Sequence, residues 1–120
     1  MPPSLKTLIT TPKLAETRAW YERLFDLVLA EEWDEPGDKG AILAFRNGQG
    51  EAFLEIYHGE AAADFSGLSL QFRVNDLEAF RTSLPADLSY AGPDKRPWGS
   101  TYIYLHDPNG IAVVVFEGGL

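Results

Sequence analysis

Apolar residues recur along this chain first with strand spacing and then with helix spacing, and this order occurs twice. Residues 5–10 (LKTLIT) form a short apolar and β-branched run, which predicts a strand. Residues 13–25 place apolar side chains near one helical face and most charged ones outside it, which predicts a helix. Thr11-Pro12 precedes this stretch and predicts its start, because threonine caps helices and proline fits a first turn.

Three strands are predicted to complete the first half, at 27–33, 41–45 and 52–58. Residues 34–40 (DEPGDKG) indicate a loop through their Pro, Gly and charge content. Asn47-Gly48-Gln49-Gly50 predicts a tight hairpin between the last two strands, since Asn and Gly tolerate positive φ. The polar, alanine-rich stretch 59–67 is expected to be a linker.

The second half shows the same order of patterns. Residues 68–74 predict a strand, and Asn75 or Asp76 can cap a short helix that runs through Leu84 and is ended by Pro85. A brief strand is predicted at 88–90, followed by a long loop at 91–99. Strands at 101–105 and 111–117 then form a hairpin around Asp107-Pro108-Asn109-Gly110.

The two halves therefore predict a duplicated β-α-β-β-β module. The predicted fold class is α+β, with two modules forming a cupped, barrel-like mixed sheet. Each helix is expected on a convex side, and the concave sides are expected to enclose a cavity, because half a repeat cannot cover its own apolar face. Residues 1–120 would form one domain, with module 1 at about 4–58, a linker at 59–66 and module 2 at about 67–118.

Composition and charge exclude several classes of protein and of binding partner. With 45% hydrophobic and 12% aromatic residues, the chain is not disordered, and the absence of cysteine excludes disulfides, thiolate metal sites and a cysteine nucleophile. No apolar run is long enough for a membrane helix, and Met1-Pro2-Pro3-Ser4 lacks a signal-peptide core, so a cytoplasmic location is expected.

Ten basic and 18 acidic residues give a net charge of −8, which argues against nucleic-acid and membrane partners. The charge fits either plain solubility or a preference for cationic ligands. Only two histidines occur, His58 and His106, so a multi-histidine metal site would need carboxylates or another subunit.

Two motifs carry a family resemblance. Residues 11–24 (TPKLAETRAWYERL) resemble a "T-x-D-L-x-x-S-x-x-F-Y-x-x-L" opening, with Trp20-Tyr21 as the aromatic pair. Trp98-Gly99 followed by Asp107-Pro108-Asn109-Gly110 resembles a closing "G…D-P-D-G" hairpin. In this order the motifs resemble the vicinal oxygen chelate superfamily, which includes glyoxalase I, extradiol dioxygenases, fosfomycin-resistance enzymes and bleomycin-resistance proteins.

The resemblance implies four metal-ligand positions, at Lys6, Glu55, Ser69 and Val114. Only Glu55 is a family ligand; lysine is protonated near neutral pH and valine cannot ligate at all. The expected cofactor is therefore none. The alternative is one divalent metal ion at Glu55, with further ligands such as His58, His106 or Glu117.

The resemblance also implies that the strands of Lys6 and Glu55 are neighbours. Lys6 is then expected to replace the metal as counter-charge for Glu55. The alternative is that Lys6 turns outward and leaves Glu55 solvated.

Strand alternation and the resemblance together assign a ligand-binding set. It combines a few polar groups with aromatic walls, as small-molecule sites do, and Trp98 would stand at the entrance. The alternative for each aromatic residue is core or dimer packing, and the sequence leaves open which face Tyr102 and Tyr104 adopt. The predicted set is Lys6, Phe53, Glu55, Tyr57, Ser69, Gln71, Trp98, Tyr102, Tyr104 and Val114.

Three functions remain open at this point. The first is a metal-free small-molecule-binding protein similar to the bleomycin-resistance type, which takes a cationic, partly aromatic ligand; aromatic faces can hold cations. The second is a metal-dependent lyase, isomerase or dioxygenase of the glyoxalase type, with Glu55 as the one candidate catalytic residue. The third is a domain that binds another protein. A homodimer is expected, because paired modules leave edge strands that dimerisation commonly covers.

Overall fold

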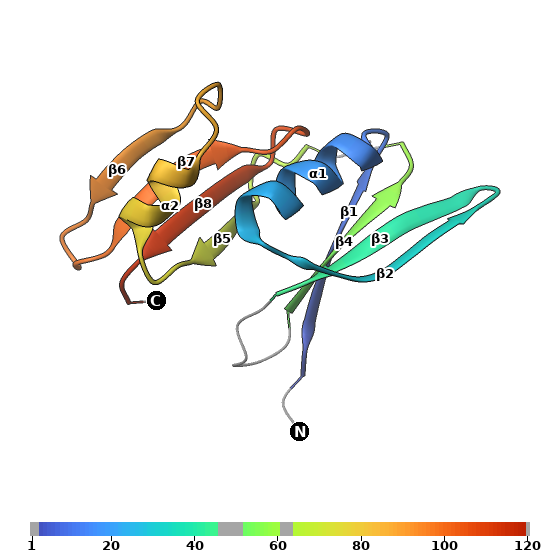
Figure 1. Cartoon of the computed structure of the whole chain (residues 1–120), viewed down its shortest axis with the longest axis horizontal. Helices are drawn as coiled ribbons and strands as arrows, with labels where there is room; N and C mark the ends of the chain where they lie inside the picture. The colour runs from blue at the N-terminus through green and yellow to red at the C-terminus, as the bar shows by residue number, and fades with distance from the viewer. Residues whose placement is uncertain (1–2, 46–51, 61–63, 120) are drawn as a thin grey trace. The chain divides into compact units, whose positions relative to one another are not determined.

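The computed structural model describes residues 3–45, 52–60 and 64–119, and the chain divides into two compact units, Met1–Ala63 and Asp64–Leu120 (Figure 1). The first unit contains β1 (Leu5–Thr11), α1 (Leu14–Phe25), β2 (Val28–Glu35), β3 (Asp38–Ala44) and β4 (Ala52–His58). The second contains β5 (Ser69–Arg73), α2 (Leu77–Ser83), β6 (Ala91–Lys95), β7 (Thr101–His106) and β8 (Ala112–Glu117). The predicted α+β class and the duplicated β-α-β-β-β order are confirmed.

The two units share one sheet topology. Their strand orders are β1-β4-β3-β2 and β5-β8-β7-β6, with the first and last strands of each unit parallel and the other pairs antiparallel. The described strands thus form two four-stranded mixed sheets, one in each unit, and these sheets are not closed into a barrel. The predicted enclosure of a cavity between the modules concerns their relative placement and stays a prediction.

In the first unit, α1 packs on β3 and β4 and covers one face of the sheet. Ile9, Leu43, Leu54 and Ile56 alternate onto this face and are almost completely buried. Tyr21 is fully buried, and its ring lies 4.8 Å from Trp20 and 6.3 Å from Phe25 between centroids. Tyr21 of the opening motif is therefore part of the core, and the half-buried Trp20 packs edge-on against it.

In the second unit, the core face of the sheet carries Ile103, Leu105, Val113 and Val115, all buried, and α2 contacts β8. The backbone N–H of Leu77 donates to Glu117 Oε1 over 2.8 Å, so the end of β8 caps the start of α2. This contact fixes the helix on the sheet.

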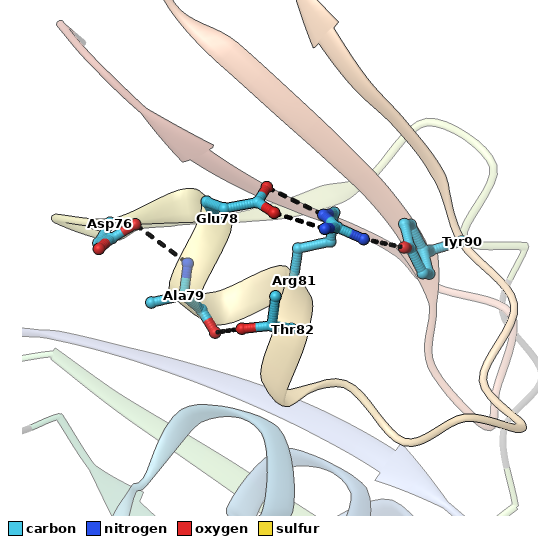
Figure 2. Close-up of polar contacts among 6 residues, drawn as sticks. All are labelled: Asp76, Glu78, Ala79, Arg81, Thr82 and Tyr90. Carbon is cyan, nitrogen blue, oxygen red and sulfur yellow. Dashed lines mark hydrogen bonds and ion pairs between the residues drawn. The ribbon is translucent and has the colours of Figure 1, made fainter.

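Figure 2 shows how α2 also holds the chain that leads into β6. Asp76 caps the helix by accepting from the N–H of Ala79 at 3.0 Å. The Arg81 guanidinium forks onto the Glu78 carboxylate and donates to Tyr90 Oη over 3.4 Å. The hydrogen bonds that Glu78 accepts from Arg81 lower the pKa of Glu78. The hydrogen bonds that Arg81 donates to Glu78 and Tyr90 raise the pKa of Arg81. Tyr90 directly precedes β6, so this cluster ties the start of that strand to α2.

Two sequence predictions near β1 and β2 are wrong. The stretch 34–40 is not a loop: β2 and β3 extend through it to a turn at Pro36-Gly37, where Gly37 has φ 75°. The pairing of Asp34 with Lys39, whose charged atoms lie 3.6 Å apart, supports this extension. Thr11 belongs to β1 and its Oγ1 accepts from the N–H of Lys13, so the helix begins at Leu14, with Lys13 at the cap position.

A third error concerns β6. No strand forms at 88–90, and the predicted loop 91–99 instead contains β6. Its proline and glycine are accommodated because β6 is an edge strand with a register irregularity between Ala91 and Asp94. Gly92 has φ 99°, and a Cβ there would lie 2.6 Å from the Tyr102 carbonyl oxygen.

The predicted turn at 47–50 and residues 61–63 of the predicted linker lie outside the described residues. Neither helix in the described ranges has the length and apolar character needed to cross a bilayer.

Candidate functional site

The sheet of the first unit carries Glu55 on the face opposite α1. Glu55 is 7% exposed, and strand pairing places Leu8 and Ile42 beside it. Lys6 Nζ lies 2.7 Å from Glu55 Oε1, which confirms the predicted ion pair and contradicts the alternative in which Lys6 turns outward. The Lys6 side chain is 50% exposed and that of Glu55 is 9% exposed, so the ammonium covers the carboxylate on its solvent side.

This pairing explains how a carboxylate tolerates its apolar surroundings. A buried charge is costly unless it is paired and hydrogen-bonded. Among the described residues, no buried side-chain nitrogen or oxygen lacks a hydrogen-bond partner. Lys6 therefore supplies the positive charge that the position of Glu55 requires.

A second cluster lies further along the same face, around Trp33 and Tyr57. Trp33 Nε1 donates to Asp38 Oδ1 over 2.8 Å, and the Trp33 and Tyr57 rings lie 6.4 Å apart between centroids. A hydrogen bond to Asp38 raises the pKa of the Tyr57 phenol. Gly40 lies against the indole, since a Cβ there would come within 2.6 Å of Trp33 Cζ2.

The sequence predicted Tyr57 but missed Trp33 and Asp38. Trp33 lies in a predicted strand whose neighbouring segment was expected to be a loop. A cross-strand partner could therefore not be assigned to it.

The residues at the family's metal positions do not fit a divalent metal. Glu55 is held by Lys6, Val114 has no donor atom, and Ser69 Oγ accepts from Gln71 Nε2 over 3.2 Å. Glu117, an alternative ligand, accepts from the Leu77 backbone, while His58 and His106 are exposed. Within the described ranges, no three His, Asp or Glu side chains converge as a metal site would require.

The second unit presents a continuous row of rings on the sheet face away from α2. We name Phe116, Tyr102, Tyr104 and Trp98 the aromatic ladder. Tyr102 stacks on Phe116 at 5.6 Å and on Tyr104 at 6.3 Å between centroids. Trp98 meets Tyr102 edge-on at 6.2 Å, and its Nε1 donates to Tyr102 Oη over 3.0 Å.

The ladder settles which face Tyr102 and Tyr104 share. Tyr102 pairs with Phe116 and Tyr104 with Val114, and all four alternate with the buried core residues of β7 and β8. Exposure rises along the ladder, from 6% at Phe116 to 37% at Tyr104 and 63% at Trp98. The ladder is therefore buried at Phe116 and exposed to solvent at Tyr104 and Trp98.

A carboxylate that the sequence missed lies beside this ladder. Asp94 pairs with Tyr102 in register, and its Oδ2 accepts from Tyr104 Oη and from Arg96 Nη1, each over 3.3 Å. Desolvation, followed by the hydrogen bond to Asp94, raises the pKa of the Tyr104 phenol. Asp94 escaped the sequence analysis because it stands in the Pro- and Gly-containing stretch predicted as a loop.

The turn that carries Trp98 is well defined. The Gly99 N–H donates to the Arg96 carbonyl over 2.9 Å, and the Arg96 N–H donates to the Ser100 carbonyl over 2.8 Å. Pro97 at the second position and Gly99 at the fourth suit such a turn, and Gly99 has φ 98°. Trp98 is therefore an exposed residue on a turn that two backbone hydrogen bonds stabilise.

The predicted site residues thus form two groups. Lys6, Phe53, Glu55 and Tyr57 share one face of the first unit through strand alternation. Ser69, Gln71, Val114, Tyr102 and Tyr104 share one face of the second unit, with Trp98 joined to it through Tyr102. Their joining into one cavity stays a prediction.

Comparison with known proteins identifies the family. Residues 5–115 match the model of the Glyoxalase/Bleomycin resistance protein/Dioxygenase superfamily. The chain belongs to this superfamily, as its two motifs suggested. The comparison with curated proteins finds no match.

Solved structures with different activities share the fold. The antibiotic binding protein TnmS3 from Streptomyces sp. CB03234 matches with a TM-score of 0.77 at 14% identity, covering 99% of this chain and 98% of that one. A FosX variant from Listeria monocytogenes, a fosfomycin resistance protein complexed with Mn(II) and a dihydroxypropylphosphonic acid, gives 0.74 at 13% identity, covering 96% and 91%. Lactoylglutathione lyase from Agrobacterium tumefaciens gives 0.67 at 23% identity, covering 98% and 96%.

Proposed function

We propose that this protein binds a cationic aromatic small molecule without a metal ion, as a binding protein of the bleomycin-resistance kind. The observation that carries the proposal is the aromatic ladder with Asp94 beside it. Exposed rings stack on flat ligands and hold cations over their faces. The net charge of −8 favours the approach of a cation.

The donor set supports the metal-free part of the proposal. Lys6 pairs with Glu55, and Val114 has no donor to contribute. The first unit would add Phe53, Tyr57 and the Lys6–Glu55 pair if the two faces join around one ligand. Likeness in fold to the antibiotic binding protein TnmS3 is compatible with this use.

Calorimetric titration with N-methylquinolinium tests the proposal, with neutral quinoline as the uncharged match. We expect the cation to bind more tightly than quinoline. Trp98→Ala should weaken binding of the cation by about five- to thirtyfold, since aromatic stacking contributes about 0.5–1.5 kcal/mol and an exposed cation–π contact about 0.5–1 kcal/mol. Trp98→Phe keeps a ring face and should lose less. Equal affinities for the Trp98→Ala variant and the wild type would contradict this assignment.

The second candidate is a metal-dependent enzyme of the glyoxalase or dioxygenase type. It is favoured by one observation, namely that Glu55 is a buried carboxylate at a metal position implied by the family pattern. It would require Lys6 to leave Glu55 and further ligands to come from outside the described clusters. Stoichiometric metal in protein purified without chelator would favour this candidate.

The proposal includes a homodimer and a cytoplasmic location, both expected from the sequence. Leu5 and Leu8 of the edge strand β1 are 66% and 51% exposed, which suits coverage by a second copy. The molar mass in solution, measured by light scattering, tests the dimer, and a monomeric mass would contradict it.

A further inference from the structure

Arg96 already occupies the place where the proposed function puts a cation. Its Cζ lies 5.1 Å from the centroid of the Trp98 ring, within the range of a cation–π contact. Its Nη1 donates to Asp94 Oδ2 over 3.3 Å. One guanidinium therefore touches an exposed ring face and a carboxylate at the same time.

We infer that the Trp98 ring face and Asp94 form a subsite for the cationic head group of the ligand, and that Arg96 is its internal competitor. The inference rests on the function proposed above and adds where the charge of the ligand docks and what it must displace. A flat organic cation fits, because the planar guanidinium of Arg96 already reaches both partners.

The local structure makes this exchange feasible. Arg96 and Trp98 stand two residues apart in one hydrogen-bonded turn, so the ring stays in place when the arginine side chain leaves. The Arg96 side chain is 44% exposed and that of Asp94 is 43% exposed, so both can exchange partners at the surface. Tyr104 Oη keeps Asp94 Oδ2 oriented toward the ladder after Arg96 departs.

The positive charge of Arg96 explains how the subsite would select cations over neutral rings. Without ligand, Arg96 neutralises Asp94 and covers one face of the exposed indole. A ligand cation that takes its place regains both contacts, while a neutral aromatic ligand must stack without the carboxylate. The subsite thereby discriminates in favour of cations and against neutral rings.

Calorimetry on Arg96→Gln, with Lys95→Gln as the matched control, tests the inference. Both substitutions remove one positive charge from the same strand end, but only Arg96 contacts Trp98 and Asp94. We expect Arg96→Gln to strengthen N-methylquinolinium binding by about two- to fivefold beyond Lys95→Gln, as an exposed cation–π contact is worth about 0.5–1 kcal/mol. Quinoline binding should change less than twofold in both variants.

Asp94→Asn supplies the second arm. It should weaken N-methylquinolinium binding in the wild-type and Arg96→Gln backgrounds alike, because the carboxylate is the partner of the bound cation. Equal gains from Arg96→Gln and Lys95→Gln, with binding intact, would overturn the inference and leave the proposed function standing. Absence of binding to every variant would overturn both.

Discussion

Replacing Asp107 by alanine is expected to lower the free energy of unfolding by about 3 kcal/mol. Asp107 is 5% exposed, and its Oδ1 accepts from the N–H groups of Asn109 and Ile111 over 2.8 and 2.9 Å. Alanine would leave both donors without this acceptor, and hydrogen bonds to charged groups contribute about 1.5–3 kcal/mol each. The variant would also lose the hydrogen bond that positions Ile111 directly before β8, the strand of Val114 and Phe116.

Urea unfolding monitored by circular dichroism measures this effect. Asp107→Asn is the matched control, because its side-chain carbonyl can still accept from the turn; it should cost about 1 kcal/mol. An Asp107→Ala variant as stable as Asp107→Asn would show that the carboxylate does not organise this turn.

Replacing Lys6 by methionine is expected to cost about 1–2 kcal/mol. The substitution keeps the apolar stem but removes the ammonium that lies 2.7 Å from the buried Glu55 carboxylate. Breaking a fully buried pair costs about 3–5 kcal/mol, and the half-exposed position of Lys6 reduces this figure because water solvates both groups in part.

Lys39→Met is the control for this experiment. Lys39 and Asp34 form a pair at 3.6 Å whose side chains are both more than half exposed, so its loss should cost less than about 0.5 kcal/mol. Adding Glu55→Gln to Lys6→Met should recover part of the lost stability, since the unpaired charge is then gone. If Lys6→Met costs no more than Lys39→Met, the ion pair does not stabilise the Glu55 face.

The strand and helix order of this fold was readable from sequence because two strong periodicities repeat. The helical face of residues 13–25 and the alternation in 101–105 and 111–117 are set by side chains that end up buried, such as Tyr21, Ile103 and Val115. Burial and hydrophobic spacing have the same cause, so the pattern predicts the element.

The errors fall where backbone pairing overrides composition. Residues 34–40 and 91–95 contain Pro, Gly and charge, and both were predicted as loops. In each, a neighbouring strand supplies hydrogen-bond partners: β2 pairs with β3 around Pro36-Gly37, and β7 holds the edge strand β6. Such pairing depends on a distant segment and leaves no local pattern.

The residues of the candidate site also divide into those that the sequence predicted and those that it missed. The Lys6–Glu55 pair followed from family strand order and simple charge matching. Alternation predicted that Tyr102 and Tyr104 share a face of β7, but not which face it is. Asp94 and Arg96 were missed because their role depends on the irregular register of β6 and on the turn that follows it. Sequence spacing alone does not reveal either feature.

The proposed cation site is made of ring faces and carboxylates and needs no metal. Its most direct test is N-methylquinolinium titration of the protein before and after dialysis against EDTA, with the metal content measured in parallel. We expect far less than one metal ion per chain, and the same affinity for N-methylquinolinium before and after chelation. Stoichiometric metal in the purified protein, with binding lost on chelation and restored by Mn(II), would contradict it.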